Sequence, residues 1–329
     1  MRFIIYGAGA IGGVIGARLV EHGYETVLIA RGQHLHAMQR HGLLLRSPNG
    51  DLRQQITAVA SPAEIDFRPN DAVILTMKSQ DTTPALDDLR AAAGDDIPVI
   101  CCQNGVANER MALRRFPNTY GMLVWLPATF LEPGVVVTHL VTKSGVLDVG
   151  GYPRGTDPVS DTVAEALTAS NFISESDEHV MRWKYAKLLG NLNNAVDAQC
   201  GRGSETRDIA HAARDEAVAC YRAAGIEWAS PDEERARRAE HMVMGEVEGE
   251  ARGGSSAWQS LARGSGSIEA DYLNGEICQL GRTWGIPTPV NHVLQAFANR
   301  AARGGSAPGS LDPGLLYEAI QKAHQGQPF

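Results

Sequence analysis

The sequence contains no uninterrupted apolar run of the roughly 18 to 20 residues that a helix needs to span a bilayer. Basic residues are also in short supply, because 30 Lys and Arg face 38 Asp and Glu and leave a formal net charge of -8. A nucleic-acid protein needs surplus positive charge on at least one face. We therefore expect neither a membrane protein nor a nucleic-acid-binding protein, although a single basic pocket is compatible with this charge.

Cysteines are few, and their spacing matches no recognisable site. The five cysteines include no CxxC pair and have no histidine partners at the spacing of zinc ligands. Free thiols of this kind are typical of a reducing compartment, and the N-terminus lacks the pattern of a cleaved signal peptide. The sequence thus predicts a cytoplasmic protein without a metal site, and its 43% apolar and 21% charged residues are ordinary for a folded chain.

The strongest local pattern is a strand, a glycine-rich turn and a helix at the N-terminus. Residues 2–6 indicate a buried strand, residues 14–20 an apolar helix, and the turn between them has the form GxGxxG. In such a turn the first glycine permits the tight bend, the second admits a pyrophosphate, and the third lets the helix approach the strand. The helix N-terminus then binds the anion. We predict a dinucleotide site formed by Gly7, Ala8, Gly9, Ala10, Ile11 and Gly12.

The end of the second predicted strand bears on the choice of dinucleotide. A site that prefers NAD usually places an acidic residue there for the ribose 2′-hydroxyl, whereas an arginine accommodates a 2′-phosphate. Ala30 and Arg31 occupy these positions. The sequence therefore favours NADP(H), with Arg31 on the phosphate and Gln33 or His34 as a helper; the alternative is that Arg31 only begins the next helix at the surface.

Two further apolar runs, residues 72–77 and 98–102, indicate central parallel strands. Lys78 follows the first of them, and Asn104 with Gly105 follows the second. Ligands bind at the carboxyl ends of parallel strands, so we expect Lys78 and Asn104 on the same edge as the glycine turn, near the nicotinamide and the substrate. Taken singly, each position is equally compatible with a solvated lysine or a simple turn.

A change of pattern divides the chain in two. Residues 118–150 indicate further strands that close the first domain, and from about residue 176 the pattern is almost entirely helical. We predict an α/β fold with a Rossmann-type doubly wound sheet in residues 1–178 and a second, all-helical domain in residues 179–329. A charged helical region at residues 232–249 is assigned to this second domain.

The helical stretch RWKYAKLLGNLNNAV, residues 182–196, combines a buried character with many polar side chains. At a helical period Lys187, Asn191 and Asn194 form one stripe, while the leucines occupy other faces. A partly desolvated lysine can act as a general acid toward a carbonyl oxygen during hydride addition, and the two amides suit a carboxylate and a hydroxyl. The alternative is a solvated lysine on an amphipathic helix, which is also what we expect of Lys184.

Taken together, these motifs resemble the ketopantoate reductase (2-dehydropantoate 2-reductase) family. The resemblance covers essentially the whole chain, because several motifs occur in the same order. They are GAGAIGG at 7–13, Arg31, TMK at 76–78, QNG at 103–105, Lys187 with Asn191, IEADYLNG at 268–275 and GIPTPVN at 285–291. The resemblance implies a Rossmann domain and a helical domain, NADPH as hydride donor, and reduction of a 2-keto acid in the cleft between the domains.

The resemblance also implies roles for individual residues. Lys187 is similar to the family's general acid, and Glu269 to its partner near the substrate hydroxyls. Asn104 and Asn191 correspond to amides that position the substrate, and Lys78 to a contact on the nicotinamide side of the cofactor. For Glu269 the alternative is an acid at a helix N-terminus, where the helix dipole favours negative charge.

Two departures from the family pattern concern the substrate. The family's substrate-binding serine lacks its usual following acid here, so Ser256, with Ser255 as the other choice, is assigned to it. The family's second asparagine on the helix falls on Ala195, next to Asn194. A displaced hydrogen-bonding group changes substrate preference strongly. The protein is thus expected to reduce 2-dehydropantoate to pantoate or, as the alternative, to be a paralogue that acts on another 2-keto or 2-hydroxy acid.

A third possibility is a non-enzymatic NADPH-binding regulator. Loss of Lys187 or Glu269 would mark it, and both residues are present. The expected partner is a small 2-keto acid, and a homodimer formed through the helical domain is compatible with the sequence.

Overall fold

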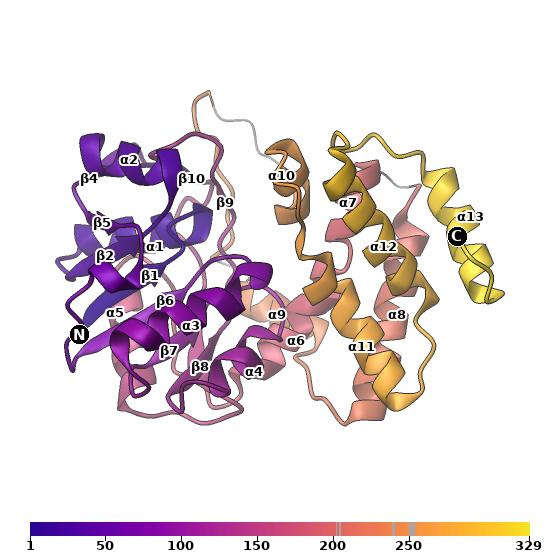
Figure 1. Cartoon of the computed structure of the whole chain (residues 1–329), viewed down its shortest axis with the longest axis horizontal. Coiled ribbons are helices and arrows are strands. Elements are labelled where there is room, and N and C mark those ends of the chain that lie inside the picture. Colours follow the sequence, from indigo (N-terminus) through magenta and orange to yellow (C-terminus); the bar gives the residue numbers. More distant parts are fainter. Residues whose placement is uncertain (202, 204, 239–240, 250–253) are drawn as a thin grey trace. The chain divides into compact units, whose positions relative to one another are not determined.

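The computed structural model describes residues 1–201, 203, 205–238, 241–249 and 254–329. The chain divides into two compact units (Figure 1). Unit 1 comprises Met1–Gln103, Ala107–Lys184 and Ser230–Arg252, and unit 2 comprises Asn104–Val106, Tyr185–Ala229 and Gly253–Phe329. No helix among the described residues is long and apolar enough to cross a membrane.

Unit 1 is built on a seven-stranded sheet in the order β11-β8-β7-β6-β1-β2-β5. All neighbours pair in parallel except β11 and β8. The strand order reverses beside β1, as a doubly wound sheet requires, so the predicted Rossmann-type fold is confirmed. The strands are β1 (Arg2–Tyr6), β2 (Thr26–Ile29), β5 (Thr57–Val59), β6 (Asp71–Leu75), β7 (Val99–Cys101), β8 (Thr119–Met122) and β11 (Val149–Gly151).

Both faces of this sheet are buried, which explains why its central strands are apolar apart from Arg2 and Asp71, which pair with each other at the start of β1 and β6. Alternate residues of β1 enter two different cores, Phe3 and Ile5 on one side and Ile4 and Tyr6 on the other. The first core is completed by helices α1 (Ala10–Glu21) and α5 (Pro158–Ala169), and the second by α3 (Thr82–Ala93) and α4 (Asn108–Leu113). The carboxyl ends of β1, β6 and β7 therefore lie at one edge between two fixed helical layers.

A second, four-stranded sheet packs on the outer side of α1. Its order is β4-β3-β10-β9, from β3 (Leu43–Arg46), β4 (Leu52–Gln54), β9 (Ala128–Thr129) and β10 (Val135–Thr138). A Cβ placed on Gly13 of α1 would lie 2.6 Å from Cγ1 of Val136, which shows how closely the helix approaches β10. The expected strands in residues 118–150 thus form, but they serve two sheets. Helix α2 (Gly32–His41) and the short turns η1 (Pro62–Glu64) and η2 (Ser79–Asp81) complete the first part of this unit.

Helix α9 (Pro231–Arg238) belongs to unit 1, whereas a single cut at residue 178 assigns it to the second domain. Its basic side chains explain the placement. Arg237 forms an ion pair of 2.6 Å with the buried Asp148, and the guanidinium of Arg238 lies 4.2 Å from the ring centre of Trp125. The basic side chains of α9 therefore interact with other residues of unit 1.

Unit 2 is all-helical, as predicted for the C-terminal part of the chain (Figure 1). Helices α8, α11 and α12 pack against one another, and α7 and α13 pack on α12. Glu216 of α8 accepts hydrogen bonds from the backbone N–H groups of Val290 and Asn291 and so satisfies the start of α12. The helical elements are α7 (Asn194–Cys200), α8 (Arg207–Ala224), α10 (Ser256–Ala262), η3 (Glu269–Tyr272), α11 (Asn274–Trp284), α12 (Pro289–Gly304) and α13 (Pro313–His324).

Helix α6 (Val180–Asn191) begins in unit 1 and ends in unit 2. The division falls after Lys184, a few residues beyond the expected boundary at 178. The predicted continuous helix over 182–196 is wrong, because the helix ends at Asn191 and α7 begins at Asn194. Asn193 has φ -73° and ψ -12°, and this ψ is too shallow to continue an α-helix, for which it is about -42°.

Candidate active site

The glycine turn of unit 1 has the shape that a dinucleotide site requires. Gly7 has φ +105°, and a Cβ there would lie 2.6 Å from the backbone nitrogen of Met77, so only glycine fits. A Cβ on Gly12 would collide with the side chain of Thr76 and the carbonyl of Gly7. At Gly9, by contrast, a Cβ would meet no atom of the described residues within 4 Å. The turn is thus closed on its inner side and open at the start of α1, where a phosphate group fits.

His34 holds this turn in place. Its Nδ1 accepts a hydrogen bond from the backbone N–H of Gly134 at 2.8 Å, so its Nε2 carries the proton and donates to the carbonyl of Ala8 at 2.6 Å. Burial lowers the pKa of His34, which keeps the ring neutral. Because both ring nitrogens are bound to backbone, His34 supports the glycine turn, and the idea that it helps to bind a cofactor phosphate is wrong.

Arg31 is exposed and occupies the N-cap position of α2, directly after β2. Burial raises the pKa of the Tyr6 hydroxyl at the end of β1, and the guanidinium of Arg31 opposes this increase. The first turn of α2, which is described in full, contains no acidic residue. The end of β2 therefore presents a cation where an NAD site would present a carboxylate.

A chain of buried hydrogen bonds joins the ends of β6 and β7. The Nε2 of Gln103 donates to the hydroxyl of Thr82, which donates to the Oδ1 of Asn108, and the Nδ2 of Asn108 donates to the hydroxyl of Ser79. Lys78 lies partly buried between β6 and these groups, at the start of η2. The sequence analysis missed Thr82 and Asn108, because a polar residue on a predicted helix gives no sign of its distant partner.

Lys184 contradicts the expectation of a solvated lysine, because it is buried in unit 1. Its Nζ lies 2.7 Å from Oε1 of the fully buried Glu109. It also donates to three backbone carbonyls at the ends of β7 and β8, those of Cys101 at 3.1 Å, Gln103 at 2.9 Å and Met122 at 3.2 Å. Burial of this ammonium is tolerated because it is paired and hydrogen-bonded at once.

In unit 2, two of the predicted site residues are in direct contact. The half-buried Lys187 donates a hydrogen bond of 2.8 Å from Nζ to the Oδ1 of Asn104. Asn191 lies one helical turn after Lys187, and its Nδ2 is buried without a hydrogen-bond partner among the described residues. A buried donor without a partner is rare in folded proteins. This one belongs to the residue one turn after Lys187 on α6.

Glu269 is buried at the start of η3, and two contacts connect its surroundings to the other site residues. Gly105 has φ +78°, and a Cβ there would lie 2.9 Å from the carbonyl oxygen of Tyr272, so the segment after Asn104 lies against η3. The Nδ2 of Asn274 donates to the carbonyl of Leu192, just beyond Asn191. Unit 2 therefore assembles the segments that carry Lys187, Asn104, Asn191 and Glu269.

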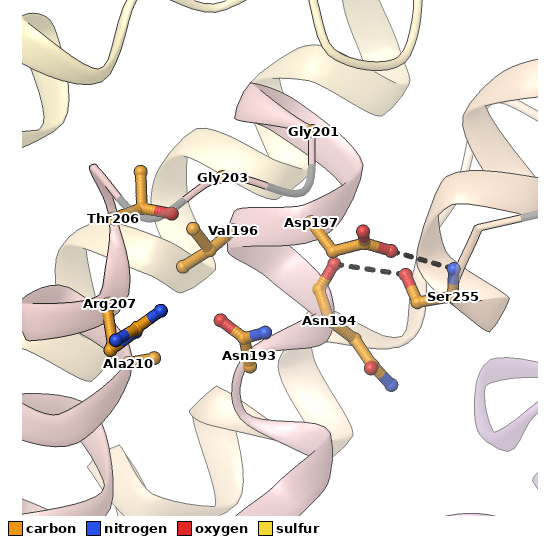
Figure 2. A pocket seen from close by; sticks show the side chains of 10 residues that line it. All are labelled: Asn193, Asn194, Val196, Asp197, Gly201, Gly203, Thr206, Arg207, Ala210 and Ser255. Atoms are coloured by element: carbon orange, nitrogen blue, oxygen red, sulfur yellow. Dashed lines mark hydrogen bonds between the residues drawn. The ribbon is translucent and has the colours of Figure 1, made fainter.

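Asn194 and Ser255 lie at a cavity of about 300 Å³ in unit 2 (Figure 2). Ser255, and not the preferred Ser256, lines this cavity together with Asn193, Asn194 and Arg207. The backbone N–H of Ser255 donates to the buried Asp197 at 2.7 Å, and its hydroxyl donates to the carbonyl of Asn194. Because the helix is interrupted before it, Asn194 does not continue the stripe of Lys187 and Asn191.

Comparison with known proteins finds one family over both parts of the chain. The model described as "Ketopantoate reductase PanE/ApbA" matches residues 3–154, and the one for its C-terminal part matches residues 179–302. The 2-dehydropantoate 2-reductase of Pyrococcus horikoshii is 28% identical, covering 93% of this chain and all of that protein. The corresponding enzyme of Archaeoglobus fulgidus is 28% identical over 89% of this chain and 95% of its own length. A crystal structure of a PanE/ApbA family ketopantoate reductase from Ralstonia eutropha has a TM-score of 0.77 at 28% identity, covering 93% of this chain and 99% of that one.

Proposed function

This chain belongs to the ketopantoate reductase PanE/ApbA family of oxidoreductases, and from that premise we propose that it reduces the carbonyl of a 2-keto acid with a nicotinamide cofactor. The contact between Lys187 and Asn104 carries this proposal, because it presents an oriented N–H donor one helical turn from Asn191, whose Nδ2 has no partner among the described residues. An ammonium group and an amide donor are what a carbonyl oxygen and a carboxylate require.

The proposed reaction adds a hydride to C2 of the substrate and a proton to its oxygen. The reduced nicotinamide, when bound, supplies the hydride. Lys187 donates the proton from Nζ to the oxygen as negative charge develops there, and it regains a proton from solvent afterwards. Asn104 orients the ammonium group of Lys187 by accepting a hydrogen bond at its Oδ1. Asn191 binds the carboxylate, and Glu269 binds a substrate hydroxyl or orients Lys187.

We propose NADP(H) as the cofactor. The open start of α1 at Gly9 suits the pyrophosphate, since the helix N-terminus favours an anion. Arg31 suits the 2′-phosphate, because it lies at the end of β2 and the described first turn of α2 offers no carboxylate for a 2′-hydroxyl. Lys78, which follows β6 on the same edge, is the proposed contact near the nicotinamide.

The preferred substrate in this proposal is 2-dehydropantoate, with another 2-keto acid as the alternative. The alternative rests on Ala195, which is buried and has no hydrogen-bonding side chain where the family pattern has an asparagine. The nearby cavity with Asn194, Ser255 and Arg207 has space for a substrate tail of different polarity. Ser256, the first residue of α10, stays the proposed substrate-binding serine, with its neighbour Ser255 as the other choice.

The test is the loss of NADPH absorbance with 2-dehydropantoate and a panel of other 2-keto acids. We expect turnover by the wild type and a loss of about 10²–10⁴-fold in kcat for Lys187→Ala, as for removal of a general acid. Lys322→Ala is the control, because Lys322 is exposed on α13 and pairs only weakly at the surface with Glu318. Full activity of Lys187→Ala would refute the proposed acid, and NADPH binding without turnover of any keto acid would refute the substrate class.

A further inference from the structure

We infer that Lys184, paired with Glu109, is a positioning residue that fixes the segment Gln103–Asn104 and thereby the acceptor of Lys187. The inference rests on the proposed reduction of a 2-keto acid. It concerns a buried ion pair that no part of the proposed chemistry uses. Lys184 then affects the turnover rate, although the proposed chemistry brings it into contact with neither the substrate carbonyl nor the side-chain amide of Asn104.

The geometry at the ends of β7 and β8 requires a donor. The pairing of β7 with β8 ends at Cys101 and Gly121, so carbonyls beyond this point need donors other than a continued β7–β8 ladder. Lys184 meets this requirement with one ammonium group, which bonds the carbonyls of Cys101, Gln103 and Met122 inside unit 1. An apolar residue at 184 would leave three buried acceptors without it.

Glu109 makes the arrangement possible. An isolated buried ammonium costs several kcal/mol, and a carboxylate 2.7 Å away offsets this cost. Stability alone does not require the pair, because an apolar pair of similar volume is often as stable or more stable. The ammonium group also fixes the backbone in one arrangement, because three carbonyls at the ends of two strands all accept hydrogen bonds from the same nitrogen atom.

The backbone that Lys184 holds leads directly into the proposed active site. Gln103, whose carbonyl Lys184 holds at 2.9 Å, is bonded covalently to Asn104, whose Oδ1 accepts from Lys187 at 2.8 Å. On the other side Gly105 packs closely against the carbonyl of Tyr272. Asn104 therefore lies between a hydrogen-bonded residue and a closely packed one. If the hold on Gln103 is lost, the amide shifts relative to Lys187, and a displacement of about 1 Å in a reacting group can cost about 10²-fold in rate.

The principal variant replaces the whole pair, Glu109→Leu with Lys184→Met, because Lys184→Met alone leaves an uncompensated buried carboxylate and is expected to unfold more easily. We expect the double variant to fold with a lowered melting temperature, because three buried carbonyls lose their donor, and to bind NADPH with an unchanged Kd below that temperature. Its kcat should fall about 10- to 100-fold, with a smaller change in KM. Lys322→Met is the surface control. Glu109→Gln keeps the side-chain shape and the donors of Lys184 but leaves the buried ammonium without a countercharge, so it should lower the melting temperature and lower kcat in the same direction.

Two readouts separate positioning from a merely structural role. Asn104→Ala combined with the double variant should be no slower than Asn104→Ala alone, because all these changes act on one hydrogen bond. Amide hydrogen exchange at residues 103–106 should also rise in the Glu109 and Lys184 variants, whether or not a substrate is known. Wild-type kcat in the double variant, rate losses that multiply with Asn104→Ala, or unchanged exchange would overturn the inference. If the wild type reduces no 2-keto acid, the proposed function fails, while hydrogen exchange still decides the role of Lys184.

Discussion

Gly9 and Gly12 belong to the same turn, yet alanine at these two positions should have opposite effects. At Gly12 a Cβ would meet three neighbours at once, the side chain of Thr76, the carbonyl of Gly7 at 2.6 Å and Cγ2 of Ile5 at 2.8 Å. At Gly9 a Cβ would meet no described atom within 4 Å, and its φ of -75° is accessible to alanine. The first change therefore acts on packing, and the second acts only on what enters the turn.

The magnitude for Gly12→Ala follows from these contacts. Overpacking a tight interior costs about 1–3 kcal/mol, and displacing Thr76 also weakens its hydrogen bond to the carbonyl of Gly7, which is worth about 0.5–1.5 kcal/mol. A loss of about 2–4 kcal/mol corresponds to a decrease in Tm of about 4–16 °C for a domain of this size class. For Gly9→Ala we expect an unchanged Tm and an NADPH Kd raised about tenfold or more, because the methyl group occupies the space of a phosphate.

Thermal unfolding followed by circular dichroism measures the first effect, and titration of the fluorescence of bound NADPH measures the second. The two variants are controls for each other, since each carries one added methyl group in the same turn. A wild-type Kd in Gly9→Ala would refute the dinucleotide site, and a wild-type Tm in Gly12→Ala would refute the close approach of α1 to β1.

Three further predictions concern single side chains. Arg31→Asp should weaken NADPH binding and leave NADH binding similar or stronger, measured as the ratio of the two Kd values, with the exposed Arg40→Asp on the same helix as control; an unchanged ratio would exclude Arg31 from the 2′-phosphate site. His34 has a lowered pKa in the folded state, so its contribution to stability is present above the unfolded value of about 6.5 and is lost as the pH falls through the lowered value. Urea unfolding at pH values from about 7.5 down to about 5 should therefore show a steeper decrease in the free energy of unfolding in the wild type than in His34→Gln. Equal slopes of this free energy against pH would contradict the neutral ring. Asn191→Ala should lower kcat/KM about 10- to 100-fold without lowering Tm, because it removes a buried donor that has no described partner; a clear loss of Tm would show that the amide is structural.

The sequence was sufficient to predict the fold of the first unit, because its central strands can be recognised from short local patterns. Each central strand is a short apolar run followed by polar residues, and the glycine turn lies between a strand and a helix, so the doubly wound sheet follows from neighbouring residues alone. The family resemblance places both Lys187 and Asn104 in the active site, and their hydrogen bond agrees with that expectation.

What the sequence could not supply depends on partners that are distant along the chain. A charged helix such as α9 does not reveal that Arg237 pairs with Asp148, which is why it was assigned to the wrong part of the fold relative to the observed units. The interruption at Asn193 changes ψ at one residue and leaves the helical periodicity almost intact, so Asn194 was expected on a stripe that ends before it. Ser255 lines the cavity because it caps α10, which is a property of the turn rather than of the residue type.

Lys184 and Lys187 show most clearly why residue type and spacing do not decide chemistry. They lie one turn apart on α6, and both donate from Nζ to groups near the end of β7. Lys184 is hydrogen-bonded to three carbonyls and paired with a carboxylate, so its three N–H bonds already have partners. Lys187 instead donates to the side chain of Asn104, in unit 2. Of two lysines on one helix, we thus propose that Lys187, which contacts the side chain of Asn104, gives the proton, and that Lys184 holds the backbone beside that asparagine.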